Sequence, residues 1–381
     1  MLVFMMSFTM LLPEMNDYIT DLGGAEQKWM ILGLWTFAAA FARPFSGKIA
    51  DNISRKSVMY FGTMVSILIC FLYPSFLTVT GFLALRLLHG FSTGFHPTGA
   101  TALIADIVPK GNRGEAMGLF GVTISIGFSA GQALGSPVKI AYGIDGLFIS
   151  AGILGIASLI LLFFVLEKNK PYKIAREKKS QEKLISKIIP KWNEIIAPEV
   201  LDPTVIMFLT AMVSGIYMMV VPDFSSHLGM ENKGSFYLYN VLFTVITRFL
   251  AGKFYDKYGA KRNLNIGIIL LIVAVLTTGT ATSVPQFLFS GIIFGIAAGI
   301  CSPALFAWTA DLSNPAFKGR GMGTMFIALE LGIVSGTYLT QTVYANDYNK
   351  LFDLFLVTAF LCFLGLVYLY FRGRIKKEVL T

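Results

Sequence analysis

The chain has 381 residues, of which 55% are hydrophobic and only 14% charged, and its mean hydropathy is +0.67. Soluble domains average about 25% charged residues, so this composition excludes an ordinary soluble enzyme or binding module and indicates a membrane protein. The formal net charge of +9 needs no nucleic-acid partner, because basic loops beside a membrane face anionic lipid.

Apolar stretches recur along the whole chain, each long enough to cross about 30 Å of hydrocarbon with roughly 20 residues. Each is predicted to be a helix, because lipid offers the backbone no hydrogen-bond partner and the alternating pattern of a barrel strand is absent. The sequence therefore predicts an all-α membrane protein with twelve transmembrane helices. The predicted spans are residues 1–18, 28–49, 58–77, 79–105, 114–137, 144–166, 203–224, 235–254, 263–282, 285–309, 320–344 and 351–371.

The first span carries two acidic residues, Glu14 and Asp17, near its outer end. The Pro13-Glu14 pair has a counterpart in the seventh span, Pro222-Asp223. Carboxylates inside a span are functional candidates, because a charge in lipid is costly. Glu14 and Asp17 are therefore candidates for carrying a proton, after Glu330, which is discussed below.

A charged string closes the second span, and it returns near the end of the eighth. Arg43, Gly47, Lys48 and Asp51 recur 205 residues later as Arg248, Gly252, Lys253 and Asp256. An internal repeat of this size, carried by hydrophobic spans, predicts two homologous halves. The predicted division is an N-terminal six-helix bundle over 1–167, a cytoplasmic linker over 168–202 and a C-terminal six-helix bundle over 203–381.

The string Gly47-Lys-Ile-Ala-Asp51-Asn-Ile-Ser-Arg55-Lys56 resembles the loop signature between the second and third helices of the major facilitator superfamily of secondary transporters. The family usually has a second Gly where Ser54 stands. The second copy does have Gly259, but its basic residues follow one position later. The resemblance covers the whole chain and implies two pseudo-symmetric six-helix bundles around a central cavity that opens alternately to each side.

The same resemblance implies a cytoplasmic gate. Asp51 is expected to meet the N-terminus of the eleventh helix, whose free N–H groups favour an anion, and Arg55 is expected to reach Asp106. The second copy, with Asp256 and Asp311, is expected to be mainly structural. The full set of expected gate residues is Gly47, Asp51, Arg55, Lys56, Asp106, Gly252, Asp256 and Asp311.

The distribution of the 31 Lys and Arg residues predicts the topology. The side that carries the signature loops holds 24 of them, the opposite loops hold four, and the helices hold three. By the positive-inside rule, the signature loops and both termini are cytoplasmic. We expect an integral protein of a bacterial inner membrane, monomeric and in contact with lipid.

Polar residues at helical spacing mark the fourth span. Arg86, His89, Thr93 and His96 lie within about 80° on a helical wheel and predict one polar stripe. Arg86-x-x-x-Gly90-x-x-x-Gly94 also resembles the family's fourth-helix motif, whose Arg is associated with proton coupling. An intramembrane Arg favours a role facing a cavity over a helix-end anchor. Each His is either a hydrogen-bonded packing residue or a contact for substrate or proton.

The fifth and eleventh spans carry a repeated polar stripe. In the eleventh it consists of Glu330, Thr337 and Gln341, and in the fifth of Ser125, Gln132 and Ser136. Glu330 is interpreted as the only carboxylate well inside a span, where burial disfavours the charged form and suits proton coupling. A structural ion pair with Arg86 is the alternative. The fifth span also contains Gly127-x-x-x-Gly131-Gln132-Ala-Leu-Gly135-Ser136-Pro137, which resembles the family's antiporter motif except at Gln132, where the family has Pro.

Gly90, Gly94, Gly127 and Gly131 recur 205 residues later as Gly295, Gly299, Gly332 and Gly336. Small residues at these steps predict close approach of helices. The linker places apolar residues at helical spacing between Leu184 and Ile196 and predicts a short amphipathic helix on the inner leaflet; a regulatory partner for it is the less favoured alternative. Aromatic candidates for lining a cavity include Trp35, Tyr217 and Tyr239.

Other functional classes lack their motifs. There is no phosphate-binding loop for ATP, no metal-ligand spacing and no nucleophile elbow, so neither a cofactor nor an enzyme is predicted. The overall pattern is most similar to the bacterial drug and sugar efflux branch of the superfamily. We expect proton-coupled export of a small organic solute; a proton-coupled uptake symporter and a transporter-like sensor or lipid-handling scaffold are the alternatives.

Overall fold

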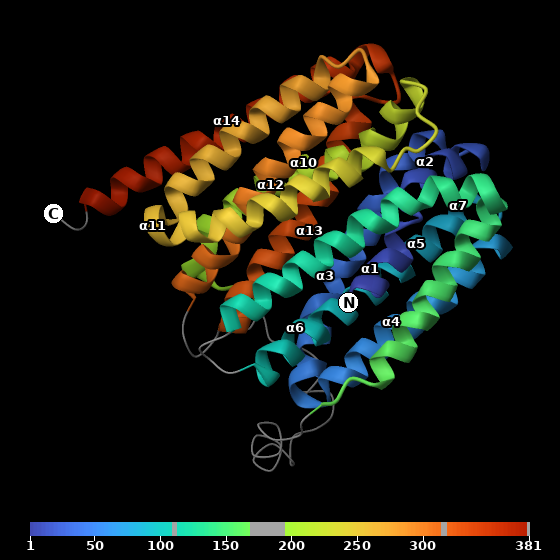
Figure 1. The fold of residues 1–381 in the computed structure, drawn as a ribbon, viewed down its shortest axis with the longest axis horizontal. Coiled ribbons are helices and arrows are strands. Elements are labelled where there is room, and N and C mark those ends of the chain that lie inside the picture. The colour runs from blue at the N-terminus through green and yellow to red at the C-terminus, as the bar shows by residue number, and fades with distance from the viewer. Residues whose placement is uncertain (109–112, 168–194, 314–317, 379–381) are drawn as a thin grey trace. The chain divides into compact units, whose positions relative to one another are not determined.

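The computed structural model describes residues 1–108, 113–167, 195–313 and 318–378 (Figure 1). Within its helices, the side chains of 51–52, 105–106, 113–115, 117–118, 249–250, 252–253, 256–257, 318–320 and 373–378 also lie outside the description. All regular structure in these residues is helical. The chain forms two compact units, Met1–Ala197 and Pro198–Thr381. Most of the predicted linker helix falls outside the described residues.

The first unit consists of helices that follow the first six predicted spans. They are α1 (Leu2–Thr9), α2 (Leu12–Asp21), α3 (Lys28–Asn52), α4 (Arg55–Leu72), α5 (Val79–Thr93), α6 (His96–Ile107) and α7 (Arg113–Phe163). The helices α1 and α2 share the first span, and α5 and α6 share the fourth. The long α7 contains the fifth and sixth spans. Gly143 divides them with a non-helical backbone at a φ of 72°, which suits glycine.

The second unit repeats this plan. It begins with a short 3₁₀ turn at Pro198–Val200, followed by α10 (Leu201–His227), α11 (Ser235–Gly279), α12 (Val284–Leu312), α13 (Lys318–Val343) and α14 (Leu351–Glu378). Gly259 divides α11 at a φ of 74°, as Gly143 divides α7. The start of α5 and the end of α6, shifted by 205, coincide with the two ends of α12, and the start of α7 coincides with that of α13.

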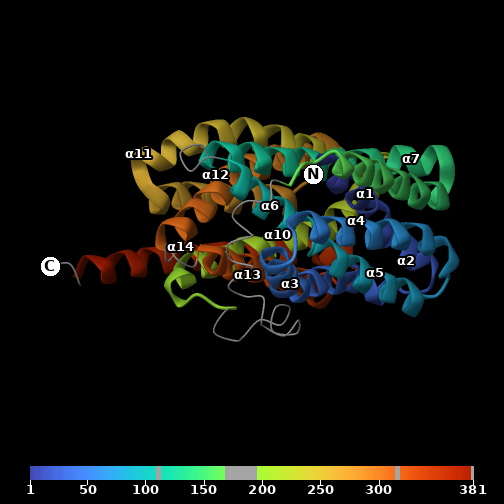
Figure 2. The same ribbon diagram turned by 90° about the horizontal axis from the view of Figure 1, so that it is seen from below.

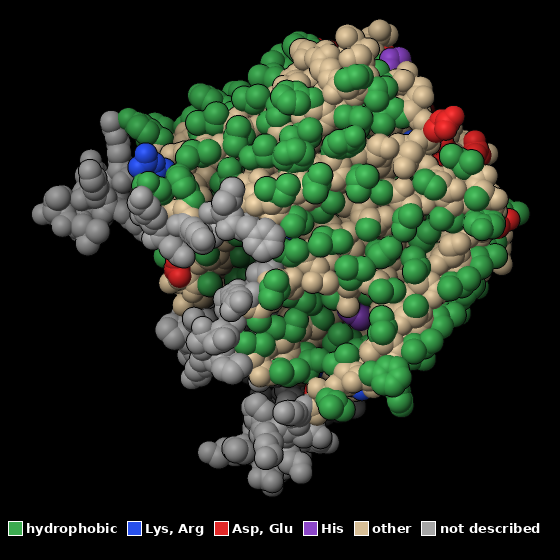
Figure 3. Space-filling model, viewed as in Figure 1, with side chains coloured by type: hydrophobic (Ala, Val, Ile, Leu, Met, Phe, Trp, Pro, Cys, Tyr) green, Lys and Arg blue, Asp and Glu red, His purple; other side chains and the backbone are tan. Residues whose placement is uncertain are grey.

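The described residues contain seven ranges that are long and apolar enough to cross a membrane, and Leu119–Phe163 among them holds two predicted spans. The other predicted spans are helical too. Two of them are divided into shorter helices, at Met10–Leu11 and Gly94–Phe95, and two carry the charged signature strings. Hydrophobic side chains cover most of the face in Figure 3, as expected for a surface in contact with lipid.

Glycines hold the helices of each unit close together. A Cβ at Gly90 would collide with the carbonyl oxygen of Trp35 on α3. One at Gly295 would collide with that of Asn240, which lies 205 residues after Trp35. The contact of α3 with α5, visible in Figure 2, therefore recurs between the first half of α11 and α12. The predicted close approach is confirmed at both positions.

A second set of glycines forms a groove on α7 for α1. Gly127, Gly131 and Gly135 lie against the backbone of Leu2, Met6 and Met10, so that one turn of α7 matches one turn of α1. In the second unit Gly332 and Gly336 pack in the same way on the backbone of α10, at Phe208 and Met212. The glycines of the antiporter-like string are therefore packing residues.

We expect Gly90→Ala to lower the melting temperature of the detergent-solubilised protein by several degrees, because overpacking costs about 1–3 kcal/mol. Gly323→Ala is the matched control, since a Cβ there meets nothing within 4 Å. Thermal unfolding followed by tryptophan fluorescence compares the two variants. Equal melting temperatures would contradict close packing at Gly90.

Candidate functional site

Arg86 lies at the centre of a buried polar cluster in the first unit. Its Nε donates to the Ile31 carbonyl oxygen at 3.1 Å and its Nη1 to the Tyr73 hydroxyl at 3.4 Å. The guanidinium carbon lies 5.7 Å from the centre of the Trp35 ring, a cation–π contact. Arg86 is 0% exposed, and its Nη2 has no hydrogen-bond partner. Within the described residues it forms no ion pair, so its charge is held by neutral groups alone.

His89 continues this cluster. Its Nδ1 lies 3.2 Å from the Tyr73 hydroxyl and its Nε2 lies 2.8 Å from Ser66 Oγ, so both ring nitrogens contact hydroxyl groups that can donate or accept. Tyr73 therefore joins Arg86 and His89. In the C-terminal unit the corresponding ring is Phe294, which stacks on Tyr217 with centroids 4.2 Å apart.

His96 belongs to a separate contact. The helix α5 ends at Thr93 and α6 begins at His96, so the single polar stripe predicted from Arg86 to His96 is wrong. His96 hydrogen-bonds Thr63 of α4 through Nδ1 at 2.7 Å and stacks on Phe4 of α1 with centroids 4.0 Å apart. Thr93 donates its hydroxyl to the Gly90 carbonyl of its own helix. Gly94 and Phe95, which lie between the two helices, keep right-handed backbone angles, so the break is a local kink.

Of the predicted aromatic candidates, Trp35 and Tyr217 are buried, and Tyr239 is exposed. Trp35 packs on Phe8 as well as on Arg86. The Tyr217 hydroxyl hydrogen-bonds Thr278 at 2.7 Å, and Thr278 in turn donates to Ser290 at 2.8 Å. The second unit thus has a neutral hydroxyl chain in place of the arginine cluster.

A second charged cluster joins α2 to α7. Glu14 is only 2% exposed, and its Oε1 and Oε2 accept hydrogen bonds from Ser136 at 2.6 Å and Lys139 at 2.7 Å. Lys139 also lies 3.6 Å from Asp17. Ser136 and Lys139 lie one turn apart on α7 and face the same carboxylate. The sequence identified Glu14, Asp17 and Ser136 but did not identify Lys139, because it was placed in a loop.

The predicted stripe of the eleventh span lies on α13. Glu330 is 4% exposed and Thr337 is 0% exposed, whereas Gln341 is partly exposed. Thr337 donates to the Val334 carbonyl of its own helix. Glu330 is not the only buried carboxylate, because Glu14 and Asp223 are also less than 5% exposed. On α7, Ser125 donates to the Gly121 carbonyl, and Gln132 is fully buried, with no partner among the described residues for either amide atom.

The signature string between α3 and α4 is fastened by Glu167, which lies just beyond α7. The carboxylate of Glu167 accepts from Ser54 Oγ at 2.7 Å and from the backbone N–H groups of Arg55 at 2.8 Å and Lys56 at 3.4 Å. These amides belong to the first turn of α4, where an anion is stabilised by free N–H groups. Ser54 itself caps α4 by accepting from the Ser57 amide at 3.0 Å.

The family model described as Major Facilitator Superfamily matches residues 1–277 and 204–380. The chain belongs to the major facilitator superfamily. It is 26% identical to the multi-drug resistance efflux pump PmrA of Streptococcus pneumoniae, with 98% of this chain and 94% of that protein covered. It is also 26% identical to multidrug resistance protein 2 of Bacillus subtilis, with 94% and 89% covered. The human organic anion transporter MFSD10 (TETRAN) shares the fold at a TM-score of 0.74 and 18% identity, over 97% of this chain and 96% of that one.

The departure from the superfamily signature at Ser54 has a structural reason. Ser54 has extended backbone angles, φ −171° and ψ 138°, which any residue adopts, and its hydroxyl caps α4. Gly259, its counterpart, has a positive φ and carries the chain through the middle of α11. The backbone therefore changes direction by different means in the two copies of the superfamily signature. In the first copy Ser54 caps a new helix, α4, and in the second a positive φ at Gly259 interrupts α11.

The other expected gate residues are only partly described. Asp51, Asp106 and Asp256 lie on helices, but their side chains are outside the described set, and Gly252 lies on α11. Asp311 accepts a hydrogen bond from Tyr255 at 2.7 Å, and Arg248 donates to Ser302 at 2.9 Å. Glu167 was missed by sequence analysis, because its partners, the Ser54 hydroxyl and two backbone amides, are more than 100 residues away and leave no local pattern.

We expect Lys139→Met to destabilise the protein by about 1–3 kcal/mol, because it leaves Glu14 buried without its cation. This is below the range for fully buried pairs, since the Lys139 side chain is 34% exposed. The double variant Glu14→Gln/Lys139→Met should recover most of the loss in thermal unfolding. Lys350→Met is the control, because its pair with Asp347 at 3.9 Å is exposed and should contribute little. Additive losses in the double variant would contradict the pair.

Proposed function

We propose that this chain is a proton-coupled secondary transporter that exports a small amphiphilic organic molecule by alternating access. The observation that carries the proposal is the similarity to multidrug efflux pumps over nearly the whole chain. The string from Gly127 to Pro137 on α7 supports export by its resemblance to the superfamily's antiporter motif, from which it departs at Gln132. The charge distribution supports an inner-membrane protein with both termini in the cytoplasm, and we propose that it works as a monomer.

Glu330 is the residue that we propose for proton coupling. It lies buried on α13, a helix apolar enough to span the membrane. A carboxylate inside a span is a functional candidate, because a charge placed in lipid is costly. Glu14 is the second candidate, and its two oxygens accept hydrogen bonds from Ser136 and Lys139.

The two bundles offer a solute different chemistry. The first holds a buried cation, Arg86, among the aromatic rings of Trp35 and Tyr73. The second holds a buried acid, Glu330, and in place of the arginine cluster a set of stacked rings that includes Tyr217 and Phe294. Aromatic rings with a few charged groups suit an amphiphilic organic solute better than a bare inorganic ion.

Glu330→Gln tests proton coupling, since the amide keeps the shape of the side chain and cannot titrate. A screen of metabolites and drugs in inside-out vesicles first identifies a transported solute. We expect the variant to lose accumulation driven by a pH gradient while it still binds that solute. Glu26→Gln, in an exposed turn outside the spans, is the matched control and should transport normally. Accumulation that survives in Glu330→Gln would move the proton site to Glu14 or Asp17.

A cytoplasmic gate at the signature is part of the proposal. Asp51→Asn should leave expression intact and reduce transport at least tenfold, because the anion that meets a helix N-terminus is lost. Flux measured in proteoliposomes with matched protein content gives the comparison. Wild-type flux would remove the gating role of Asp51. A complete absence of solute-dependent flux in the wild-type chain, under any gradient, would instead favour a sensor or lipid-handling scaffold.

A further inference from the structure

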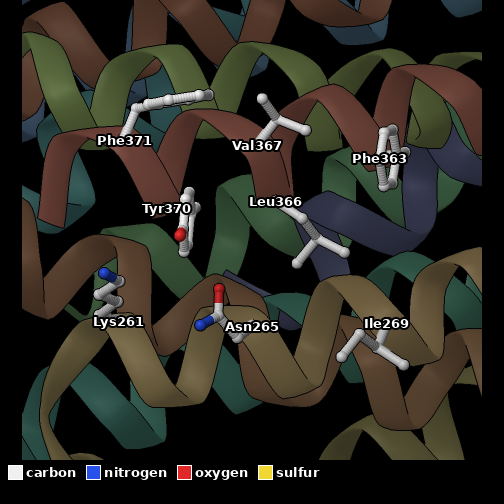
Figure 4. Close-up of a pocket in the computed structure, with 8 residues that line it drawn as sticks. All are labelled: Lys261, Asn265, Ile269, Phe363, Leu366, Val367, Tyr370 and Phe371. Carbon is white, nitrogen blue, oxygen red and sulfur yellow. The ribbon is translucent and has the colours of Figure 1, made fainter. Parts of the chain in front are cut away.

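A groove of about 480 Å³ lies in the second unit between the second half of α11 and α14 (Figure 4). Along α11 its lining changes over successive turns from Lys261 through Asn265 to Ile269. On α14 the corresponding change runs from Tyr370 through Leu366 to Phe363. The groove therefore has a polar end and an apolar end, and Figure 4 shows Lys261, Asn265 and Tyr370 gathered at the former.

The repeat provides an internal comparison. The first unit has a smaller groove of about 340 Å³ between α4 and α7, lined by Tyr60, Phe163 and neighbouring apolar residues. Subtracting 205 places Lys56 at the position of Lys261. Lys56 already has hydrogen-bond partners within the protein: its Nζ donates to the carbonyl oxygens of Phe163 at 2.9 Å and Val165 at 2.7 Å.

The two lysines differ because the helices opposite them end differently. The helix α7 ends at Phe163, so its last carbonyls are free to accept from Lys56. The helix α14 continues to Glu378, so the corresponding carbonyls are used within the helix. Lys261 is exposed and forms no hydrogen bond, ion pair or ring contact with the described residues.

We propose that the groove between α11 and α14 binds an anionic phospholipid, with the phosphate at Lys261 and Asn265 and an acyl chain along Ile269, Leu366 and Phe363. The groove opens on a helix surface that lipid covers, and the proposed topology places Lys261 at the cytoplasmic leaflet, which carries the anionic lipids. From Lys261 to Ile269 the helix rises about 12 Å, which brings an acyl chain well below the head group. Asn265 supplies an amide donor one turn below the lysine.

Native mass spectrometry of the detergent-solubilised full chain tests the site with phosphatidylglycerol and phosphatidylcholine of identical acyl chains. We expect the wild-type chain to retain phosphatidylglycerol about fivefold better, as one basic residue at an anionic surface would provide. Lys261→Gln should abolish the preference. Arg262→Gln, which removes the same charge one residue away, should retain it, since Arg262 packs on the Tyr258 ring 4.8 Å from its centre. No preference in the wild-type chain, or an equal loss in both variants, would overturn the proposal.

A photoactivatable phosphatidylglycerol with its reactive group in the acyl chain locates the lipid. In membranes that contain the full chain, we expect labelling of the peptide around Phe363 and Leu366 to exceed that of the equivalent peptide around Leu159 and Phe163. Lys261→Gln should remove this difference. Equal labelling of the two peptides in the wild-type chain would show general lipid contact only and would overturn the site.

Discussion

Lipid provides no hydrogen-bond partner, so a buried charge needs partners within the protein, and two of the described charges, Arg86 and Glu14, find them on other helices. Arg86 of α5 is held by a carbonyl and an indole of α3 and by the hydroxyl that follows α4. Glu14 of α2 is held by two residues of α7. Each arrangement links helices that are far apart in the sequence.

The two halves share their packing and their signature charges, and they differ in the buried polar groups around Arg86. The collision that a side chain would cause at Gly90 recurs at Gly295, so the backbone approach is common to both units. The polar groups are not repeated, since Phe294 stands where His89 stands in the first unit. Because packing explains the repeated residues, the unrepeated ones are where solute recognition and coupling are expected. Lys261 corresponds to Lys56 in the repeat but differs from it in its contacts. The longer α14 leaves Lys261 without the carbonyl partners that Lys56 has.

The sequence predicted the helical class, the repeat and the close contacts at its glycines, because hydrophobic length and small-residue spacing are local signals. It did not predict the break between Thr93 and His96, since a polar stripe on a helical wheel assumes an unbroken helix. It also missed Glu167, whose partners Ser54, Arg55 and Lys56 are 111 to 113 residues away, and Lys139, whose partner Glu14 is 125 residues away. These contacts depend on tertiary geometry, which leaves no pattern in a single sequence. The side chains of Asp51 and Asp106 lie outside the described residues, and the gate between them stays a prediction.

The central functional claim is that solute leaves the cell in exchange for protons. The most direct test follows a transported solute in proteoliposomes of known protein orientation, with the pH gradient imposed first in one direction and then reversed. The account predicts that net solute movement reverses with the gradient and always opposes the movement of protons. Solute movement in the same direction as protons, under both gradients, would contradict export by antiport and establish an uptake symporter.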